Sequence, residues 1–213
     1  ALENIPILSY LLLRGKCSDC GSHISLRYPA IELLSAITSL LVVWKFGLSY
    51  ETFFAIFLTW ALITLTFIDI DHYLLPDDIT LTFLWLGLGA HIFVDNLFGI
   101  NLQSAVLGAI FGYLLLWIVY QLFRLMTGKE GMGFGDFKLL SMFGAWFGWQ
   151  MLPLIILLSS AAGAILGGAL LILKNKSRDH PIPFGPYLCI AGWIAMIWGN
   201  DIITAYLQFS RFQ

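Results

Sequence analysis

The sequence predicts an all-α protein that crosses a membrane several times, and three observations lead to this class. Apolar residues make up 59% of the chain and charged residues only 11%, whereas soluble proteins average about 25% charged residues. The mean hydropathy is +0.85. The apolar residues are also gathered into long runs, most of them near the roughly 17–25 residues that a transmembrane helix needs. A very apolar soluble helical protein is therefore a poor alternative.

Seven transmembrane helices are expected in this chain of 213 residues. Five correspond to separate apolar runs at residues 29–46, 51–68, 79–94, 102–126 and 185–207. The remaining apolar stretch, 137–173, is too long for one crossing. It is interrupted at Gly148-Trp149-Gln150 and at Pro153, so we interpret it as two helices.

The basic residues lie mainly on one side of the predicted bundle, because alternate loops between seven spans share a side. Nine of the eleven fall on that side: Arg14, Lys16, Arg27, Arg124, Lys129, Lys138, Lys174, Lys176 and Arg178. The other side has only Lys45 and Arg211. Cytoplasmic loops of membrane proteins carry an excess of Lys and Arg. The N-terminal segment and the loop before residue 137 are therefore predicted to face the cytoplasm.

An acidic segment, "FIDIDHYLLPDD" at 67–78, follows the second predicted span on this side. Asp69 ends the span, and carboxylates at membrane depth usually face the protein interior or a water-filled cavity. Asp71 points about 200° away from Asp69 on a helix, so we expect only one of them to face a given partner. Asp77 and Asp78 belong to the first turn of the next helix, where the helix dipole favours acids.

A second acidic segment, "GMGFGDFK" at 131–138, returns to the same side. The helix after Asp136 has some 13 residues and is only about 20 Å long, whereas the apolar core of a bilayer is about 30 Å thick. Asp136 is therefore expected below the cytoplasmic surface. Gly133 and Gly135 can adopt positive φ and let another backbone approach closely. We interpret this loop as the rim of a polar cavity.

Two carboxylates in one cavity indicate acid–base hydrolysis of a peptide. One ionised aspartate takes a proton from water while its protonated partner polarises the scissile carbonyl. Because Asp69 ends a helix and Asp136 begins one, the helix dipoles place the shared proton on Asp69. Two alternatives use the same residues differently: a transporter or channel with intramembrane acids, and a membrane scaffold with a cytoplasmic metal-binding loop.

Cys17 and Cys20 form a CxxC pair in the N-terminal segment. On the reducing cytoplasmic side, such a pair is more typical of structural zinc than of a disulfide. A closed tetrahedral zinc site needs four ligands, and His23 is at most a third. The sequence therefore predicts an incomplete zinc site.

The segments "FIDIDHYLLPDD" and "GFGD" together resemble the type IV prepilin peptidases, the bacterial branch of the GxGD intramembrane aspartyl proteases. The resemblance extends through "ENIPILSYLLLRGKCSDC", "RYPAIELL" and "PFGPYL". It implies that Asp69 and Asp136 are the catalytic pair and that Gly133 and Gly135 shape the second loop. It also implies cleavage of prepilin and pseudopilin leader peptides after a glycine, at the cytoplasmic face.

The same resemblance implies a multi-pass protein of the bacterial inner membrane that serves type IV pili or type II secretion. Its partners would be prepilins and membrane lipids, with no nucleic acid. The peptidase activity needs no cofactor, whereas zinc and S-adenosylmethionine, the donor for N-terminal methylation, are expected in the full-length enzyme. We divide the chain into a cytoplasmic segment, 1–28, and a transmembrane peptidase domain, 29–213. Members usually carry an earlier CxxC preceded by another span, so half the zinc site and an eighth helix are expected before Ala1.

Overall fold

The computed structural model describes residues 5, 7–129, 131–167 and 183–211, and the regular elements in these ranges are helices. The α-helices are α1 (Leu8–Leu12), α2 (Arg27–Phe46), α3 (Tyr50–His72), α4 (Asp77–Phe93), α5 (Leu102–Thr127), α6 (Phe134–Phe147), α7 (Leu152–Ala162) and α9 (Gly185–Arg211). Three short turns connect some of them: η2 (Leu97–Gly99), η3 (Trp149–Met151) and η4 (Gly163–Gly167).

A helix occurs at each of the seven predicted places, and the division of the long apolar stretch into two helices is confirmed. Gly148 ends α6 in a conformation with φ of 76°, and Pro153 lies in the first turn of α7. Residues 168–173 of that stretch lie outside the described residues. Five of the helical stretches in the described ranges are long and apolar enough to span a membrane: α2, α3, α5, the run from η3 to η4, and α9. Helices α4 and α6 are shorter, with 17 and 14 residues.

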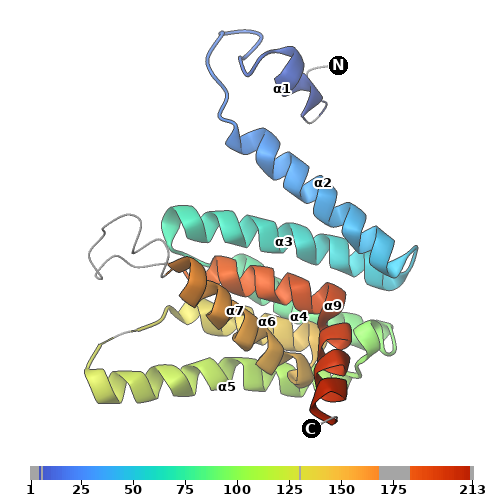
Figure 1. Cartoon of the computed structure of the whole chain (residues 1–213), viewed down its shortest axis with the longest axis vertical. Helices are drawn as coiled ribbons and strands as arrows, with labels where there is room; N and C mark the ends of the chain where they lie inside the picture. Colours follow the sequence, from blue (N-terminus) through green and yellow to red (C-terminus); the bar gives the residue numbers. More distant parts are fainter. Residues whose placement is uncertain (1–4, 6, 130, 168–182, 212–213) are drawn as a thin grey trace.

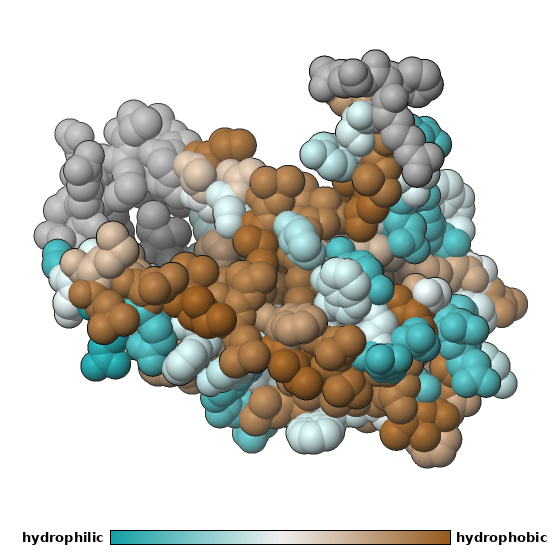
Figure 2. Space-filling view, turned by 90° about the horizontal axis from the view of Figure 1, so that it is seen from below, coloured by the Kyte–Doolittle hydropathy of each residue, from teal (hydrophilic) through white to brown (hydrophobic). Residues whose placement is uncertain are grey.

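The helices from α3 onward pack side by side, and α2 lies along the outer side of α3 (Figure 1). Helix α6 occupies the centre, because it contacts α4, α5, α7 and α9. All its residues from Asp136 to Phe147 are buried except Lys138. The outer surface is largely apolar on the face that Figure 2 shows. Exposed side chains such as Leu40, Trp44 and Trp85 are suited to lipid contact, and the chain is an all-α polytopic membrane protein.

Helices α5 and α6 approach each other closely at three glycines. A Cβ atom on Gly108 would meet the carbonyl oxygen of Gly144, and a Cβ on Gly144 would meet that of Gly108. One turn along α5, a Cβ on Gly112 would lie 2.6 Å from the carbonyl oxygen of Leu140. Small residues at such crossings let helix backbones touch inside a membrane. This contact fixes the position of α6, which begins beside the polar residues described next.

Candidate active site

Asp69 lies in the last turn of α3 and points into the protein. Tyr73 ends this helix in the left-handed conformation, and its N–H donates to the carbonyl oxygen of Asp69 at 2.9 Å. The Asp69 side chain is buried, since the residue is only 5% exposed. Its Oδ2 atom accepts a hydrogen bond from the backbone N–H of Gly185, the first residue of α9, at 3.0 Å. The end of α3 and the start of α9 therefore meet at this carboxylate.

Asp71 faces away from Asp69, as the helical geometry predicted. Its two oxygens accept hydrogen bonds from Arg27 at 2.9 Å and 2.6 Å. The Arg27 guanidinium also lies 5.0 Å from the centre of the Phe67 ring. These contacts join the start of α2 to the end of α3 on the outer surface.

Asp136 lies in the first turn of α6 and is 7% exposed. Helix α6 begins at Phe134, so Phe134, Gly135 and Asp136 are helical rather than part of a loop. Gly133 and Gly135 can adopt positive φ, but neither does so here: Gly133 has φ of −76°, and Gly135 is helical. Gly135 does allow a close approach, because a Cβ there would lie 2.8 Å from the Cβ of Leu75. Its role is therefore steric rather than conformational.

Asp69 and Asp136 line the same cavity, although 66 residues separate them in the sequence. Its volume is about 1050 Å³. The walls come from three segments: residues 73–78 between α3 and α4, residues 131–136 at the start of α6, and residues 183–184 before α9. Figure 1 shows that the end of α3 and the start of α6 lie at the same end of the bundle. This cavity is large enough for a segment of extended peptide.

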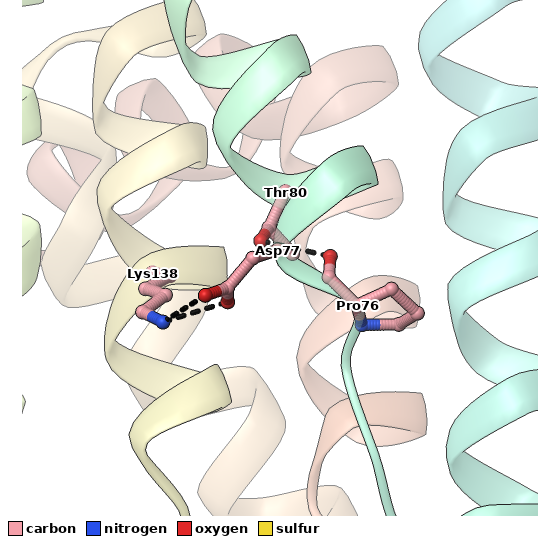
Figure 3. A network of polar contacts seen from close by, with 4 residues as sticks. All are labelled: Pro76, Asp77, Thr80 and Lys138. Carbon is pink, nitrogen blue, oxygen red and sulfur yellow. Dashed lines mark hydrogen bonds and ion pairs between the residues drawn. The ribbon is translucent and has the colours of Figure 1, made fainter.

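An ion pair in the lining of the cavity joins the first turns of α4 and α6 (Figure 3). The ammonium group of Lys138 is 2.6 Å from each carboxylate oxygen of Asp77. The same turn of α4 contains a hydrogen bond from the Thr80 hydroxyl to the carbonyl oxygen of Pro76, at 3.1 Å. The position of Asp77 in the first turn was predicted, but its partner was not. Lys138 was assigned only to a basic cytoplasmic side, since helix periodicity alone does not place it opposite Asp77.

The CxxC pair lies in a tight loop of the N-terminal segment. The N–H of Cys17 donates to the carbonyl oxygen of Ser22, and Gly21 turns the chain with φ of 68°. The hydroxyl of Ser22 lies 3.0 Å from the Sγ of Cys20, and this contact is the main reason that the pKa of Cys20 is lowered to about 7. No group of three or more His, Cys, Asp or Glu side chains able to hold a metal occurs within the described ranges. Two thiols do not fit a closed four-ligand zinc site, so the expectation of zinc gains no support here.

Comparison of the sequence with known proteins identifies the family of this chain. Residues 56–168 match the type IV leader peptidase family, and residues 1–46 match the bacterial peptidase A24 N-terminal domain. The prepilin leader peptidase/N-methyltransferase of Pseudomonas aeruginosa is 56% identical over 213 residues, which cover 99% of this chain and 72% of that protein. The proteins of the same name from Stutzerimonas stutzeri and Legionella pneumophila are 54% and 51% identical, with 99% and 98% of this chain covered and 72% of each relative. No solved structure matches the chain. The chain belongs to the type IV leader peptidase family, which argues against the transporter and scaffold alternatives.

Proposed function

We propose that this member of the type IV leader peptidase family removes the leader peptide of prepilins and pseudopilins and methylates the new N-terminus. The names of the relatives support both reactions. The observation that carries the peptidase assignment is the position of Asp69 and Asp136. Both carboxyl groups are buried, come from separate segments and line one cavity.

In the proposed mechanism, the two aspartates share one proton. The ionised aspartate removes a proton from a water molecule, and the resulting hydroxide attacks the carbonyl carbon of the scissile bond. The protonated aspartate donates a hydrogen bond to the carbonyl oxygen, which becomes a hydroxyl in the tetrahedral intermediate. When the carbon–nitrogen bond breaks, a proton passes to the leaving amine and the carboxylic acid product forms. The pair is then again singly protonated.

The proposed site faces the cytoplasm of a bacterial inner membrane. The excess of basic residues on the side of Asp69 and Asp136 supports this orientation. The apolar outer surface supports contact with membrane lipids, and the family supports a role in type IV pili or type II secretion.

S-adenosylmethionine would supply the methyl group for the second reaction. A second cavity of about 800 Å³ lies at the opposite ends of α3 and α4, lined by Tyr50, Phe53, Phe54, Phe93, Val94 and Asp95. Its place away from the basic side does not fit a cytoplasmic methyl donor, and its lining is mostly aromatic and aliphatic. We therefore assign no residue of this chain to methyl-donor binding and derive no step for methylation.

Cleavage by the purified chain tests the peptidase proposal. The wild-type chain is incubated with a prepilin, and mass spectrometry identifies the new N-terminus. Asp69→Asn and Asp136→Asn should each remove activity, by about 10³-fold or more, while leaving a folded protein. The control is Asp201→Asn, which removes an exposed acid that pairs with Lys45 at 2.7 Å, and it should remain active. Full activity of either variant of the pair would refute the assignment.

A further inference from the structure

We infer that Gly185, the first residue of α9, is a positioning residue for the catalytic pair because it fixes the place of the Asp69 side chain. This inference rests on the proposed function of Asp69 and Asp136. It assigns a task to the segment "PFGPYL" (183–188), for which the sequence offered only a family resemblance.

The first observation is the hydrogen bond between the two residues. The Gly185 N–H donates to Asp69 Oδ2 at 3.0 Å, and Asp69 makes no other side-chain hydrogen bond or ion pair within the described ranges. A buried carboxyl group without a donor is costly. A donor on the backbone of a 27-residue helix is also rigid, because no side-chain rotation can move it. The start of α9 therefore holds one oxygen of Asp69 and leaves the other for the reaction.

The second observation is the lack of space around Gly185. A Cβ atom there would lie 2.6 Å from Asp69 Oδ2 and 3.1 Å from Leu75 Cδ2. Gly185 does not have positive φ, so its conformation does not demand glycine. Glycine is needed at this position for lack of space, because any side chain would clash with the carboxyl group of Asp69.

Leu75 extends this contact to the second aspartate. It is 6% exposed and packs against Gly185 on one side and Gly135, the neighbour of Asp136, on the other. A change at Gly185 therefore moves Asp69 directly and disturbs the side chain that separates α9 from the first turn of α6. The two glycines and Leu75 together set the distance between the two carboxyl groups.

The variant Gly185→Ala tests this role because it keeps the N–H and adds only a methyl group. A misplacement of about 1 Å costs about 100-fold in rate when the binding of the substrate is otherwise intact. We therefore expect kcat to fall by about 10- to 100-fold while KM changes less than kcat, because the atoms nearest to the added methyl group belong to Asp69 and Leu75, two of the residues that line the cavity.

Gly192→Ala is the matched control on the same helix. A Cβ atom at Gly192 would meet the ring of Phe143 in the core, away from the cavity. It should lower thermal stability at least as much as Gly185→Ala, but the folded protein should keep its kcat. Both variants are measured in the full chain, in detergent, with a prepilin substrate and with thermal unfolding as a second measurement.

A double-mutant cycle of melting temperatures tests the contact between Gly185 and Asp69 without relying on catalysis. Gly185→Ala should lower the melting temperature less in an Asp69→Ala background, where the carboxyl group it displaces is absent. This arm remains informative if Gly185→Ala alone fails to fold, because the double variant should then be recovered. Equal losses of melting temperature in both backgrounds would overturn the inference.

Two further outcomes separate the inference from the proposed function. If the wild-type chain cleaves prepilin and Gly185→Ala retains its kcat, or loses it only in proportion to folded protein as Gly192→Ala does, the inference fails alone. If the wild-type chain does not cleave prepilin, the proposed function fails and the positioning role falls with it.

Discussion

The Asp77 carboxylate and the Lys138 ammonium group form an ion pair in the lining of the cavity, with Nζ 2.6 Å from both oxygens. Asp77 follows the segment that leaves Asp69, and Lys138 lies two residues after Asp136. The pair therefore joins the two segments that carry the proposed catalytic residues. We expect it to hold these segments in position and to contribute little to the free energy of unfolding.

Removing this ion pair should affect cleavage more than stability. The Asp77 side chain is 54% exposed and the Lys138 side chain 26% exposed, so Lys138→Met should cost less than about 1 kcal/mol of unfolding free energy. The rate of cleavage should fall several-fold, because the ion pair no longer holds the first turns of α4 and α6 together. The charge-swapped double variant Asp77→Lys/Lys138→Asp should recover most of the lost kcat. If the double variant cleaved no faster than Lys138→Met, the result would mean that one of the two charges contacts the substrate.

Asp71→Asn should be much milder than Asp69→Asn, although the two positions lie in the same turn of α3. The Asp71 side chain pairs with Arg27 on the outer surface, and both side chains are partly exposed, at 36% and 43%. Loss of such a pair costs about 0–1 kcal/mol of unfolding free energy. Cleavage assays and thermal unfolding of both variants measure the difference. Equal loss of cleavage at the two positions would contradict the assignment of Asp69 as the member that faces the cavity.

Gly144→Ala should destabilise the fold strongly. A methyl group at Gly144 meets the backbone of α5 at Gly108, and backbone cannot rotate out of the way as a side chain can. Overpacking of this kind costs about 1–3 kcal/mol or more. The control is Gly89→Ala in α4, where a Cβ atom has nothing within 4 Å and the expected change is a gain of up to about 1 kcal/mol. Thermal unfolding in detergent distinguishes the two variants. If Gly144→Ala had the melting temperature of the wild-type chain, α5 and α6 would not be in contact at this position.

Cys20 and Cys189 should differ sharply in their reaction with a thiol-alkylating reagent in metal-free buffer. Cys20 is exposed, and because its pKa is lowered to about 7, roughly half of it is thiolate at neutral pH. Its alkylation rate should rise through a midpoint near pH 7. Ser22→Ala removes the hydroxyl that stabilises the thiolate, so it should move this midpoint to higher pH. Mass spectrometry of the labelled sites reports the rates.

Cys189 provides the internal reference for that experiment. It is 2% exposed in α9 and should remain unlabelled until the protein unfolds. If Cys189 reacted as fast as Cys20, the packing of α9 would differ from the structure described above.

Hydropathy was sufficient to predict the helices, because lipid contact and burial both demand long apolar runs. The convergence of Asp69 and Asp136 was also predictable, since topology returns their segments to one side and charged groups at membrane depth need a polar cavity. The conformation of the glycines was not predictable in the same way. Gly133 and Gly135 were interpreted as part of a loop at the rim of a cavity, because the spacing of glycines does not distinguish a left-handed turn from a helix start that needs space.

The contacts between distant segments were beyond the sequence argument. The dipole argument for the shared proton considered only the helices that carry Asp69 and Asp136, and it omitted the amide that α9 presents to Asp69. Likewise, the sequence argument gave no role to Gly108 and Gly112, which the structure places against the backbone of α6 at Gly144 and Leu140. Such contacts depend on the relative rotation of helices, and the apolar periodicity of nearly uniform spans does not encode that rotation clearly.

The burial of α6 also constrains how the protein is assembled during synthesis. At 14 residues the helix is about 21 Å long, and it begins with a carboxyl group, so alone it would neither fill the bilayer nor shield Asp136 from lipid. Helices α4 and α5 emerge from the ribosome before α6 and offer it a surface, whereas α9 emerges after α6 and brings Gly185 to Asp69. A nascent chain therefore lacks this contact to Asp69 until α9 has docked. The positioning role inferred for Gly185 therefore links the onset of peptidase activity to the docking of α9.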